Sequence, residues 1–389
     1  MKVFLDHAST TPVREASRDA LLAALAEVGN PQSVHGHGQR TRAQLEDARD
    51  ELALAIDCNR SEVVFNSGGT EANNQAIKGI YWARNQNAKR PIIISSAIEH
   101  HALLDPIEWL CKHEGAELKL LKLLPSGEID LAHLQELVTD LGDQIALISL
   151  MWVNNEVGIV TDIEAVTKIA GDVPVHSDAV QAFGHLPVSF KKSGLAAMSI
   201  SGHKIGAPIG VGALIVSRSL KPESLLHGGG QERGLRSGTM SYPLAKSLAA
   251  AATDAVRDLE SRQSRLKTLR DRFEADLLAA IPDARITAAI QNRIEHSSNV
   301  ILPGTKSDSM LFLLDEQGLS VSAGSACQAG VLGPSHVLMG MGYSEADATA
   351  CLRVSFGHTS KPEDVDFAIT AITKAHAKAI KAQAVAART

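Results

Sequence analysis

Residues Met198–Gly212 read MSISGHKIGAPIGVG, a short apolar strand followed by a glycine-rich loop. Lys204 lies at this change from strand to loop, next to His203. In open α/β sheets, ligands bind beyond the carboxyl ends of the strands. A lysine at such a place can form a Schiff base with a carbonyl cofactor, although a lysine in an exposed loop is the commoner case when position alone is considered. The segment therefore indicates an α/β sheet with a ligand at its edge.

Residues 60–216 contain short apolar runs that alternate with amphipathic helical patterns. Several of these runs are rich in β-branched residues and continuously apolar, which is typical of strands buried on both faces of a parallel sheet. Their alternation with helices predicts an α/β fold in which helices cover the sheet. We predict a mainly parallel sheet of seven strands at Val63–Phe65, Pro91–Ser95, Leu118–Leu123, Ile145–Val153, Val173–Asp178, Met198–Ser201 and Val211–Val216.

The chain of 389 residues is long enough for two domains. A long helical region follows Tyr242 and ends near residue 278, with an alanine-rich first part and a charged second part. We place the domain boundary in or near this region. The prediction is a large cofactor-binding domain over residues 15–255 and a smaller α+β domain formed by residues 1–14 and 256–389.

Composition excludes several classes of protein. The net charge is −6 and no dense block of lysine and arginine occurs, so we expect no direct binding of nucleic acid. No apolar run approaches the roughly 20 residues of a membrane span, and the N-terminus lacks the apolar run of a signal peptide. The four cysteines form no C-x-x-C pair, which argues against a metal site within the chain or a disulfide framework. We therefore expect a soluble, cytoplasmic protein.

A carboxylate follows the apolar run in Val173–Gln181, VPVHSDAVQ. Asp178 stands at the end of this run, and Gln181 lies about one helical turn further on. A carboxylate here would suit the ring nitrogen of pyridoxal phosphate (PLP), because it keeps the nitrogen protonated and lets the ring draw electrons from a substrate. Taken alone, Asp178 could equally be the N-cap of the next helix.

Three other segments also place polar groups after predicted strands. In Asn66–Asn74, NSGGTEANN, two glycines precede a helix, so free N–H groups could hold a phosphate there. This kind of junction is common, and it is not a P-loop because no lysine follows the second glycine. His100, in the sequence EHH, could stack on a cofactor ring or be an ordinary buried polar residue. Asn154–Gly158, NNEVG, could hydrogen-bond the ring or a substrate carboxylate.

Taken together, these segments resemble the NifS/IscS-like cysteine desulfurases, which belong to the class V aminotransferase group of fold-type I PLP enzymes. The likeness covers nearly the whole chain, from LDHASTTP to LRVSFG. The matching stretches are SGGTEANN, EHHALLD, NNEVG, HSDAVQAFG, SGHKIGAPIGVGAL, HGGGQERGLRSGT, GSACQAG and LRVSFG. Several such motifs in the same order are highly specific. The resemblance implies PLP as cofactor, L-cysteine as substrate and a homodimer.

The resemblance implies a role for each matching residue around the cofactor ring. Lys204 would bind PLP as a Schiff base, and Asp178 would pair with the ring nitrogen. Gln181 would bond the phenolic oxygen. His100 would stack on the ring and assist catalysis.

The resemblance also implies how the phosphate and the substrate are held. Thr239 of one subunit would reach the phosphate of the other, so that each site is shared across the homodimer. Asn155 would contact the cofactor and, with Arg353, would bind the substrate carboxylate, to which the planar fork of an arginine is matched. The remaining phosphate ligands would be Gly69, Thr70, Ser201 and His203.

Cys327 lies in Val321–Gly333, VSAGSACQAGVLG, among small residues that make a poor core element. We therefore predict a catalytic thiol on a loop at about residues 322–335 of the smaller domain, rather than the buried structural thiol that is the usual fate of a free cysteine. The sequence GSAC resembles the S-x-A-C motif of group I desulfurases. This likeness implies that the Cys327 thiolate attacks the sulfur of PLP-bound cysteine, leaving alanine and a persulfide. Cys327 could also serve at a metal cluster shared with another protein.

The sequence departs from many relatives at Gln328-Ala329, in the loop IGAPIG and in its short C-terminal tail. These differences leave the PLP chemistry intact but put the sulfur acceptor in doubt. A scaffold or a thiolase is expected, for iron–sulfur assembly, tRNA thiolation or DNA phosphorothioation. Two other functions stay open: a selenocysteine lyase or other PLP-dependent C–S lyase, and a non-catalytic scaffold with the same fold.

Overall fold

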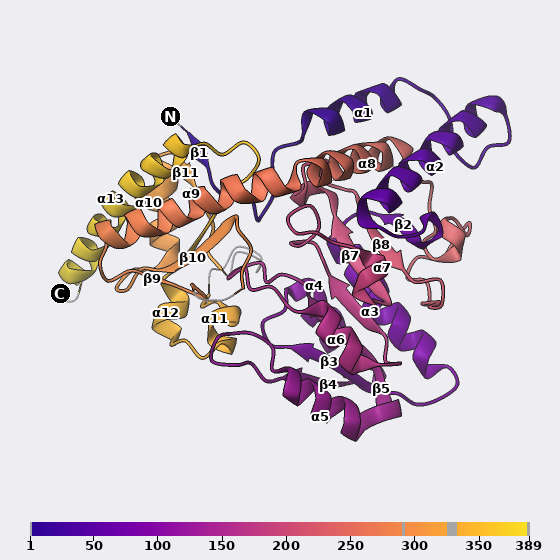
Figure 1. Ribbon diagram of the computed structural model, residues 1–389, viewed down its shortest axis with the longest axis horizontal. Coiled ribbons are helices and arrows are strands. Elements are labelled where there is room, and N and C mark those ends of the chain that lie inside the picture. Colours follow the sequence, from indigo (N-terminus) through magenta and orange to yellow (C-terminus); the bar gives the residue numbers. More distant parts are fainter. Residues whose placement is uncertain (1, 290–291, 325–332, 387–389) are drawn as a thin grey trace.

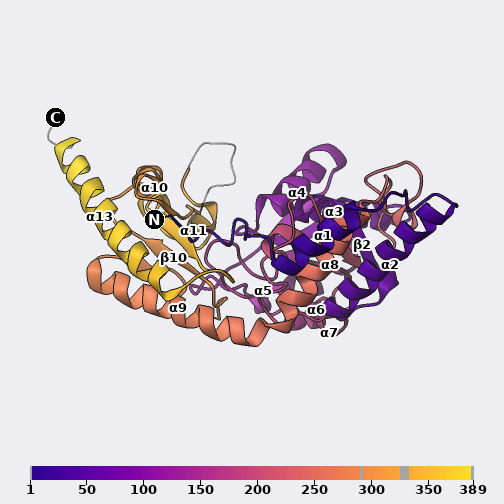
Figure 2. The same ribbon diagram turned by 90° about the horizontal axis from the view of Figure 1, so that it is seen from above.

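The computed structural model describes residues 2–289, 292–324 and 333–386 of the chain. Figure 1 shows a larger body built around a sheet and a smaller body beside it, formed by the C-terminal part of the chain and the first residues. In the view turned by 90°, helix α9 (Leu259–Ala280) runs along one side of the smaller body and leads into the larger one (Figure 2). Within these ranges, no helix has the length and apolarity needed to cross a bilayer.

The larger body contains the predicted mainly parallel sheet of seven strands, which is confirmed. The strands follow one another in the order β2-β8-β7-β6-β5-β3-β4. Only β8 runs against its neighbours within this sheet, being antiparallel to both β7 and β2. The bounds are β2 (Val63–Asn66), β3 (Ile92–Ser96), β4 (Glu117–Leu121), β5 (Ile145–Met151), β6 (Val175–Asp178), β7 (Ala197–Ser201) and β8 (Gly212–Val216).

Two strands end earlier than the apolar runs predict. The run at 145–153 leaves the sheet after Met151, because Val153 pairs with Val160 in a local antiparallel bridge. The run at 118–123 leaves after Leu121, since Leu123 pairs with Ile129 in the same way. Both early ends turn the chain away at the edge where ligands bind in open α/β sheets.

Side chains of the sheet alternate between two hydrophobic cores, as the pleat of a strand requires. In β3, Ile92 and Ile94 join one core while Ile93 joins the other. The first core is covered by α2 (Gly36–Ile56), α5 (Leu131–Leu141), α6 (Ile163–Ala170) and α8 (Tyr242–Arg257). The second core is covered by α3 (Gly69–Asn85) and α4 (His101–Glu114). The sheet is therefore buried on both faces, which explains its continuously apolar strands.

The smaller body has a hydrophobic core of its own. An antiparallel sheet of β9 (Arg285–Ile286), β10 (Ser297–Ile301) and β12 (Cys351–Ser355) packs there with α9, α10 (Ser307–Glu316) and α13 (Pro362–Ala386). The first strand, β1 (Val3–Phe4), pairs in parallel with β11 (Leu319–Ser320), and Val3 and Leu5 belong to this core. The division into residues 15–255 and 1–14 with 256–389 stays a prediction, which the separate cores support.

The remaining helices are short or connect the two bodies. The long helical region after Tyr242 is two helices, because the chain bends at Asp258 between α8 and α9. The other helices are α1 (Glu15–Leu25), α7 (Phe190–Ser193), α11 (His336–Gly340) and α12 (Glu345–Thr349), with the 3-10 turns η1 (Arg60–Glu62), η2 (Gly142–Gln144), η3 (Gly202–Lys204) and η4 (Glu232–Gly234).

The segment after β1 crosses from the smaller body to the edge of the large sheet. Its backbone N–H groups at Thr11 and Arg14 donate hydrogen bonds to the carbonyl oxygens of His203 (3.0 Å) and Gly206 (2.8 Å). The same segment is tied to the smaller body, where Ser355 N–H donates to the Leu5 carbonyl at 2.8 Å. The carboxyl end of the sheet is thus bounded by chain from both bodies.

A buried ion pair fixes the loop around η4 against the sheet. Arg49 of α2 donates two hydrogen bonds to the Glu232 carboxylate, both at 2.7 Å, and Phe65 N–H donates to the same group at 2.9 Å. Glu232 and its neighbour Arg233 have positive φ values of 47° and 59°, which L side chains rarely adopt. The paired carboxylate therefore holds a backbone conformation that would otherwise be unfavourable.

We predict that replacing Glu232 with alanine lowers the free energy of unfolding by about 3–5 kcal/mol, because Arg49 is then left buried without its partner. Glu46 also contacts Arg49, at 3.3 Å, but is 40% exposed. Glu46→Ala should therefore cost less than about 1 kcal/mol. Urea unfolding followed by circular dichroism measures both, and equal losses in the two variants would show that burial of the pair is not what stabilises the loop.

Candidate active site

A cavity of about 320 Å³ lies at the carboxyl end of the parallel strands. Its walls come from the ends of β5, β6 and β7, from the first turns of α3 and α4, and from β12 and the segment at 322–324 of the smaller body. The cavity brings together most of the residues that the sequence predicted for the site: Gly69, Thr70, His100, Asn155, Asp178, Gln181, Ser201, His203, Lys204 and Arg353.

Lys204 is held at both its side chain and its backbone. It ends the 3-10 turn η3, which follows β7 directly. Its Nζ donates hydrogen bonds to the carbonyl oxygens of Ala8 (2.7 Å) and Ser9 (2.6 Å) in the crossing segment. Its own carbonyl oxygen accepts a hydrogen bond from His185 Nε2 at 3.2 Å. The amine is therefore presented at the sheet edge from a fixed backbone position.

Asp178 is the last residue of β6 and is almost fully buried. Its Oδ1 accepts a hydrogen bond from Val180 N–H at 2.8 Å, and its Oδ2 accepts one from Asn73 Nδ2 at 2.6 Å. Burial raises the pKa of Asp178 above its usual value, while these two hydrogen bonds and the charge of Lys204 oppose that rise. A cationic N–H group placed against this buried carboxyl group would favour its ionised form.

The junction between β2 and α3 forms a concave backbone surface facing Ser201. Gly68 is the N-cap of α3, has φ 147° and leaves the helix without a side-chain cap. A Cβ at Gly69 would lie 2.8 Å from Val180 Cγ2, so this position requires glycine. The buried Nδ1 of His203 has no hydrogen-bond partner among the residues that the structure describes. The first N–H groups of a helix and an unsatisfied ring nitrogen together suit an anion.

His100 caps α4, with its Nδ1 accepting a hydrogen bond from Ala102 N–H at 3.0 Å. Burial lowers the pKa of His100 to about 4, and the charge of Lys204 acts in the same direction. The imidazole is therefore neutral at physiological pH. Because Nδ1 is the acceptor, the ring proton is on Nε2.

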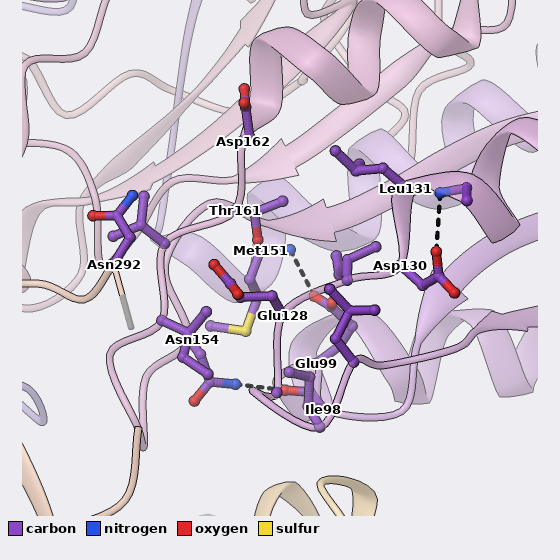
Figure 3. Close-up of a pocket in the computed structure, with 16 residues that line it drawn as sticks. Ile98, Glu99, Glu128, Asp130, Leu131, Met151, Asn154, Thr161, Asp162 and Asn292 are labelled. Atoms are coloured by element: carbon purple, nitrogen blue, oxygen red, sulfur yellow. Dashed lines mark hydrogen bonds between the residues drawn. The ribbon is translucent and has the colours of Figure 1, made fainter. Parts of the chain in front are cut away.

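The turn that carries His100 is fixed by the residues shown in Figure 3. The Glu99 carboxyl accepts a hydrogen bond from Met151 N–H at 2.6 Å, and Asn154 Nδ2 donates to the Ile98 carbonyl at 2.8 Å. Burial raises the pKa of Glu99 well above its usual value. These residues also line a larger cavity of about 510 Å³, separate from the one around Lys204 but sharing Met151 with it. Glu99 thus helps to hold the turn that precedes His100.

Arg353 of β12 is buried and points into the cavity around Lys204. Its Nη1 donates to the Asn155 carbonyl oxygen at 2.8 Å, and its Nη2 donates to Asp6 Oδ1 at 2.9 Å. Its Nε has no hydrogen-bond partner within the described part of the chain. A buried guanidinium with an unsatisfied donor can bind a carboxylate.

Of the predicted residues that the structure describes, one is not part of this cavity. Thr239 follows the loop around η4 and does not line it; its predicted contact with a partner subunit stays a prediction. Cys327 falls outside the described residues. The segment that leads to it, Ser322 to Gly324, does line the cavity.

The other thiols are unsuited to be nucleophiles. Burial raises the pKa of Cys58 to about 12 and that of Cys351 to about 11, so both stay protonated. Cys111 is half-buried, and burial raises the pKa of its thiol too.

Comparisons with known proteins identify the family. The family model described as Aminotransferase class-V matches residues 3–367. The "IscS-like cysteine desulfurase" of Mycobacterium tuberculosis is 44% identical over 388 residues, covering 99% of this chain and 98% of that protein. The chain belongs to the class-V aminotransferases, in their cysteine desulfurase group.

Solved structures of this family match the fold as well as the sequence. A structure described as "NIFS-LIKE PROTEIN" superposes with a TM-score of 0.89 and 31% identity, over 96% of this chain and 99% of that one. Another, "SspA in complex with cysteine", gives a TM-score of 0.78 and 30% identity, over 91% and 98%. The α/β fold and the family predicted from the sequence are therefore confirmed.

Class-V aminotransferases depend on PLP, and the residues of the cavity fit that cofactor. Lys204 offers an amine, and Asp178 offers a buried carboxyl group at the end of β6. The glycine junction at 68–69 and the unsatisfied His203 Nδ1 offer an anion cradle. The neutral His100 offers an aromatic surface without adding positive charge.

Several residues of the site were missed by the sequence analysis. Asn73 lies one helical turn after Gly69 on α3, and this spacing after the glycine junction could have pointed to it. The carbonyl groups of Ala8 and Ser9 leave no signal in a sequence, because any residue has one. Asp6 and Glu99 lie within the quoted stretches LDHASTTP and EHHALLD, but their contacts at the site become visible only in the fold.

We predict that Asn73→Ala weakens PLP affinity about tenfold or more, since it removes a hydrogen bond of a kind worth about 1.5–3 kcal/mol when one partner is charged. Asn74 is the neighbouring residue of α3, and its Nδ2 donates a hydrogen bond to the Thr70 carbonyl oxygen at 3.0 Å, not to Asp178. Asn74→Ala should leave the affinity nearly unchanged. Fluorescence titration of cofactor-free protein with PLP measures both, and equal affinities for the two variants would contradict the assigned support of Asp178.

Proposed function

We propose that this protein binds PLP at Lys204 and acts as a cysteine desulfurase, taking sulfur from L-cysteine and holding it as a persulfide on Cys327. The observation that carries the proposal is the meeting of Lys204, Asp178 and Arg353 at one cavity whose wall continues into residues 322–324. Family membership supports the same activity. The solved relative described with bound cysteine supports the substrate.

The reaction needs no external oxidant. L-Cysteine and the Cys327 thiol give L-alanine and a Cys327 persulfide; a sulfur–sulfur bond forms while the carbon–sulfur bond of the substrate breaks. The carbon that loses sulfur gains a proton. When bound, PLP supplies an electron sink for the charge that develops at the substrate α-carbon.

The large body supplies the groups that hold the cofactor. Lys204 Nζ would anchor it, and once displaced by the substrate amine would move the α-proton. Asp178 would keep the ring nitrogen protonated, and Gln181 would face the phenolic oxygen. His100 would lie against the ring as a neutral imidazole. Phosphate ligands would be Gly69, Thr70, Ser201 and His203.

The smaller body supplies the groups that handle the substrate. Arg353 would bind the substrate carboxylate through the donor that is unsatisfied in the described chain, assisted by the side chain of Asn155. The hydrogen bond from its Nη2 to Asp6 Oδ1, at 2.9 Å, keeps the guanidinium in this orientation. The bound substrate would then present its sulfur on the side of residues 322–324, from which the chain continues to Cys327.

Cysteine desulfurases transfer sulfur to acceptors, and we propose the same for this chain. The acceptor would be a scaffold or thiolase protein in the cytoplasm, for iron–sulfur assembly or for thiolation of tRNA or another cofactor. The active unit would be a homodimer in which Thr239 reaches the phosphate of the partner subunit.

We predict that Cys327→Ser keeps the yellow colour of Lys204-bound PLP but lowers persulfide formation more than about a hundredfold, because the nucleophile is removed. Lys204→Ala should lose the colour itself. Absorbance spectra follow the cofactor, and intact-protein mass after mixing with L-cysteine follows the persulfide.

Cys111→Ser is the matched control, since it removes a half-buried thiol outside the cavity and should leave both readouts unchanged. A Cys327→Ser protein that released sulfide and alanine at the wild-type rate, with a thiol reductant present in both reactions to supply the two electrons, would refute the proposal. That outcome would favour a C–S lyase that needs no protein thiol.

A further inference from the structure

The buried carboxyl group of Glu156 contacts the chain on both sides of residues 325–332. Ser335, on the C-terminal side, donates a hydrogen bond from Oγ to Glu156 Oε2 at 2.5 Å. On the N-terminal side, a Cβ at Gly324 would lie 2.1 Å from the same oxygen, so the glycine backbone packs directly against it. Residues 324 and 335 are thus brought to one point by a side chain of the large body.

Glu156 itself is held rigidly. Its N–H donates to Asn154 Oδ1 at 2.9 Å, and the Asn154 side chain in turn donates to the Ile98 carbonyl (Figure 3). The preceding residue, Asn155, accepts a hydrogen bond from Arg353 Nη1 at its carbonyl oxygen. The carboxyl group therefore stands on a turn that is connected to the His100 turn and to the proposed substrate-binding arginine.

Both flanking segments are docked near the same groups. On the N-terminal side, Ser322 and Arg353 exchange two backbone hydrogen bonds, at 3.1 and 2.7 Å. On the C-terminal side, His336 Nε2 donates to the Glu99 carbonyl oxygen at 2.9 Å. Ser335 Oγ also accepts Leu338 N–H at 3.1 Å, so its proton is available for Glu156. Each flank has its own anchor, and Glu156 joins the two.

We propose that Glu156 is a positioning residue for sulfur transfer, which holds residues 324 and 335 together and so fixes, beside Arg353, the two ends between which the sequence carries Cys327. This inference rests on the proposed function. Its physical basis is proximity: a displacement of about 1 Å in the approach of a reacting group can cost about a hundredfold in rate. The contact needs an acceptor oxygen on a side chain with the shape of glutamate. It does not need a negative charge.

The burial of the Glu156 carboxyl group is consistent with a contact that does not depend on its charge. It raises the pKa of Glu156, although the Ser335 hydrogen bond and the charges of His336 and Arg353 act against the rise. Glutamine has the same shape and a carbonyl oxygen that can accept the Ser335 hydrogen bond. Glu156→Gln should therefore keep the link, whereas Glu156→Ala and Ser335→Ala should remove it.

The test separates the cofactor step from the thiol step in PLP-loaded protein. Rapid mixing with L-cysteine gives the first as a change in PLP absorbance, and quenched samples give the second as persulfide on Cys327 by mass. We expect Glu156→Ala and Ser335→Ala to slow persulfide formation about tenfold or more, with the absorbance change within about twofold of wild type. The double variant should be no slower than the single ones, since they break one contact.

Two variants serve as controls. Glu156→Gln should stay within about threefold of wild type in both steps, because it preserves the acceptor. Ser344→Ala removes the N-cap of α12, as Ser335→Ala removes that of α11, but Ser344 has no contact with Glu156 in the described chain. It should leave both rates unchanged, so that loss of a helix cap is separated from loss of the link.

Wild-type persulfide rates in Glu156→Ala and Ser335→Ala would overturn the inference, and so would an equal slowing of both steps. Gly324→Ala tests the other flank independently if Glu156→Ala does not fold, and it should again slow only the thiol step. Wild-type protein that binds PLP and consumes cysteine without forming a Cys327 persulfide would refute the proposed function itself. Because that result needs only wild-type protein, it is distinguished from the results with the Glu156, Ser335 and Gly324 variants.

Discussion

The hydrogen bonds from Lys204 Nζ to the carbonyl oxygens of Ala8 and Ser9 join the larger and the smaller body at the cavity. The lysine belongs to the edge of the large sheet, and the two carbonyl groups belong to a segment that starts in the smaller body. A parallel sheet brings the ends of its strands to one edge, and the crossing segment closes that edge from the other side. The site therefore exists only when both bodies are folded and in contact.

Burial sets the charge of this site. It lowers the pKa values of His100 and His203 to about 4 and raises those of Asp178 and Glu99, so that most of these groups tend toward their neutral forms. Lys204 and Arg353 bring basic side chains to the cavity. Such an environment favours a ligand that brings its own negative charge together with a cationic N–H for Asp178. A PLP ring with its phosphate has both properties.

Much of this arrangement could be predicted from the sequence, because it depends on local patterns. The apolar β-branched runs specify a sheet buried on both faces, and the polar residues that follow them, such as Asp178 and Lys204, mark its functional edge. What the sequence does not reveal depends on approach in three dimensions. Glu156 lies in a predicted motif, yet its contacts at Gly324 and Ser335 join residues more than a hundred positions away. The early end of β5 likewise follows from a pairing between Val153 and Val160 that the apolar run does not encode.

In the proposed reaction, a cofactor anchored at Lys204 and the thiol of Cys327 serve one substrate. A crystal structure of the PLP-loaded protein with L-cysteine bound tests it most directly. We expect the ring nitrogen within hydrogen-bond distance of the Asp178 carboxylate, the substrate carboxylate on Arg353, and an open path from the Cys327 sulfur to the substrate sulfur. A Cys327 sulfur enclosed in a core with no such path, or a cofactor bound away from Lys204, would contradict the account.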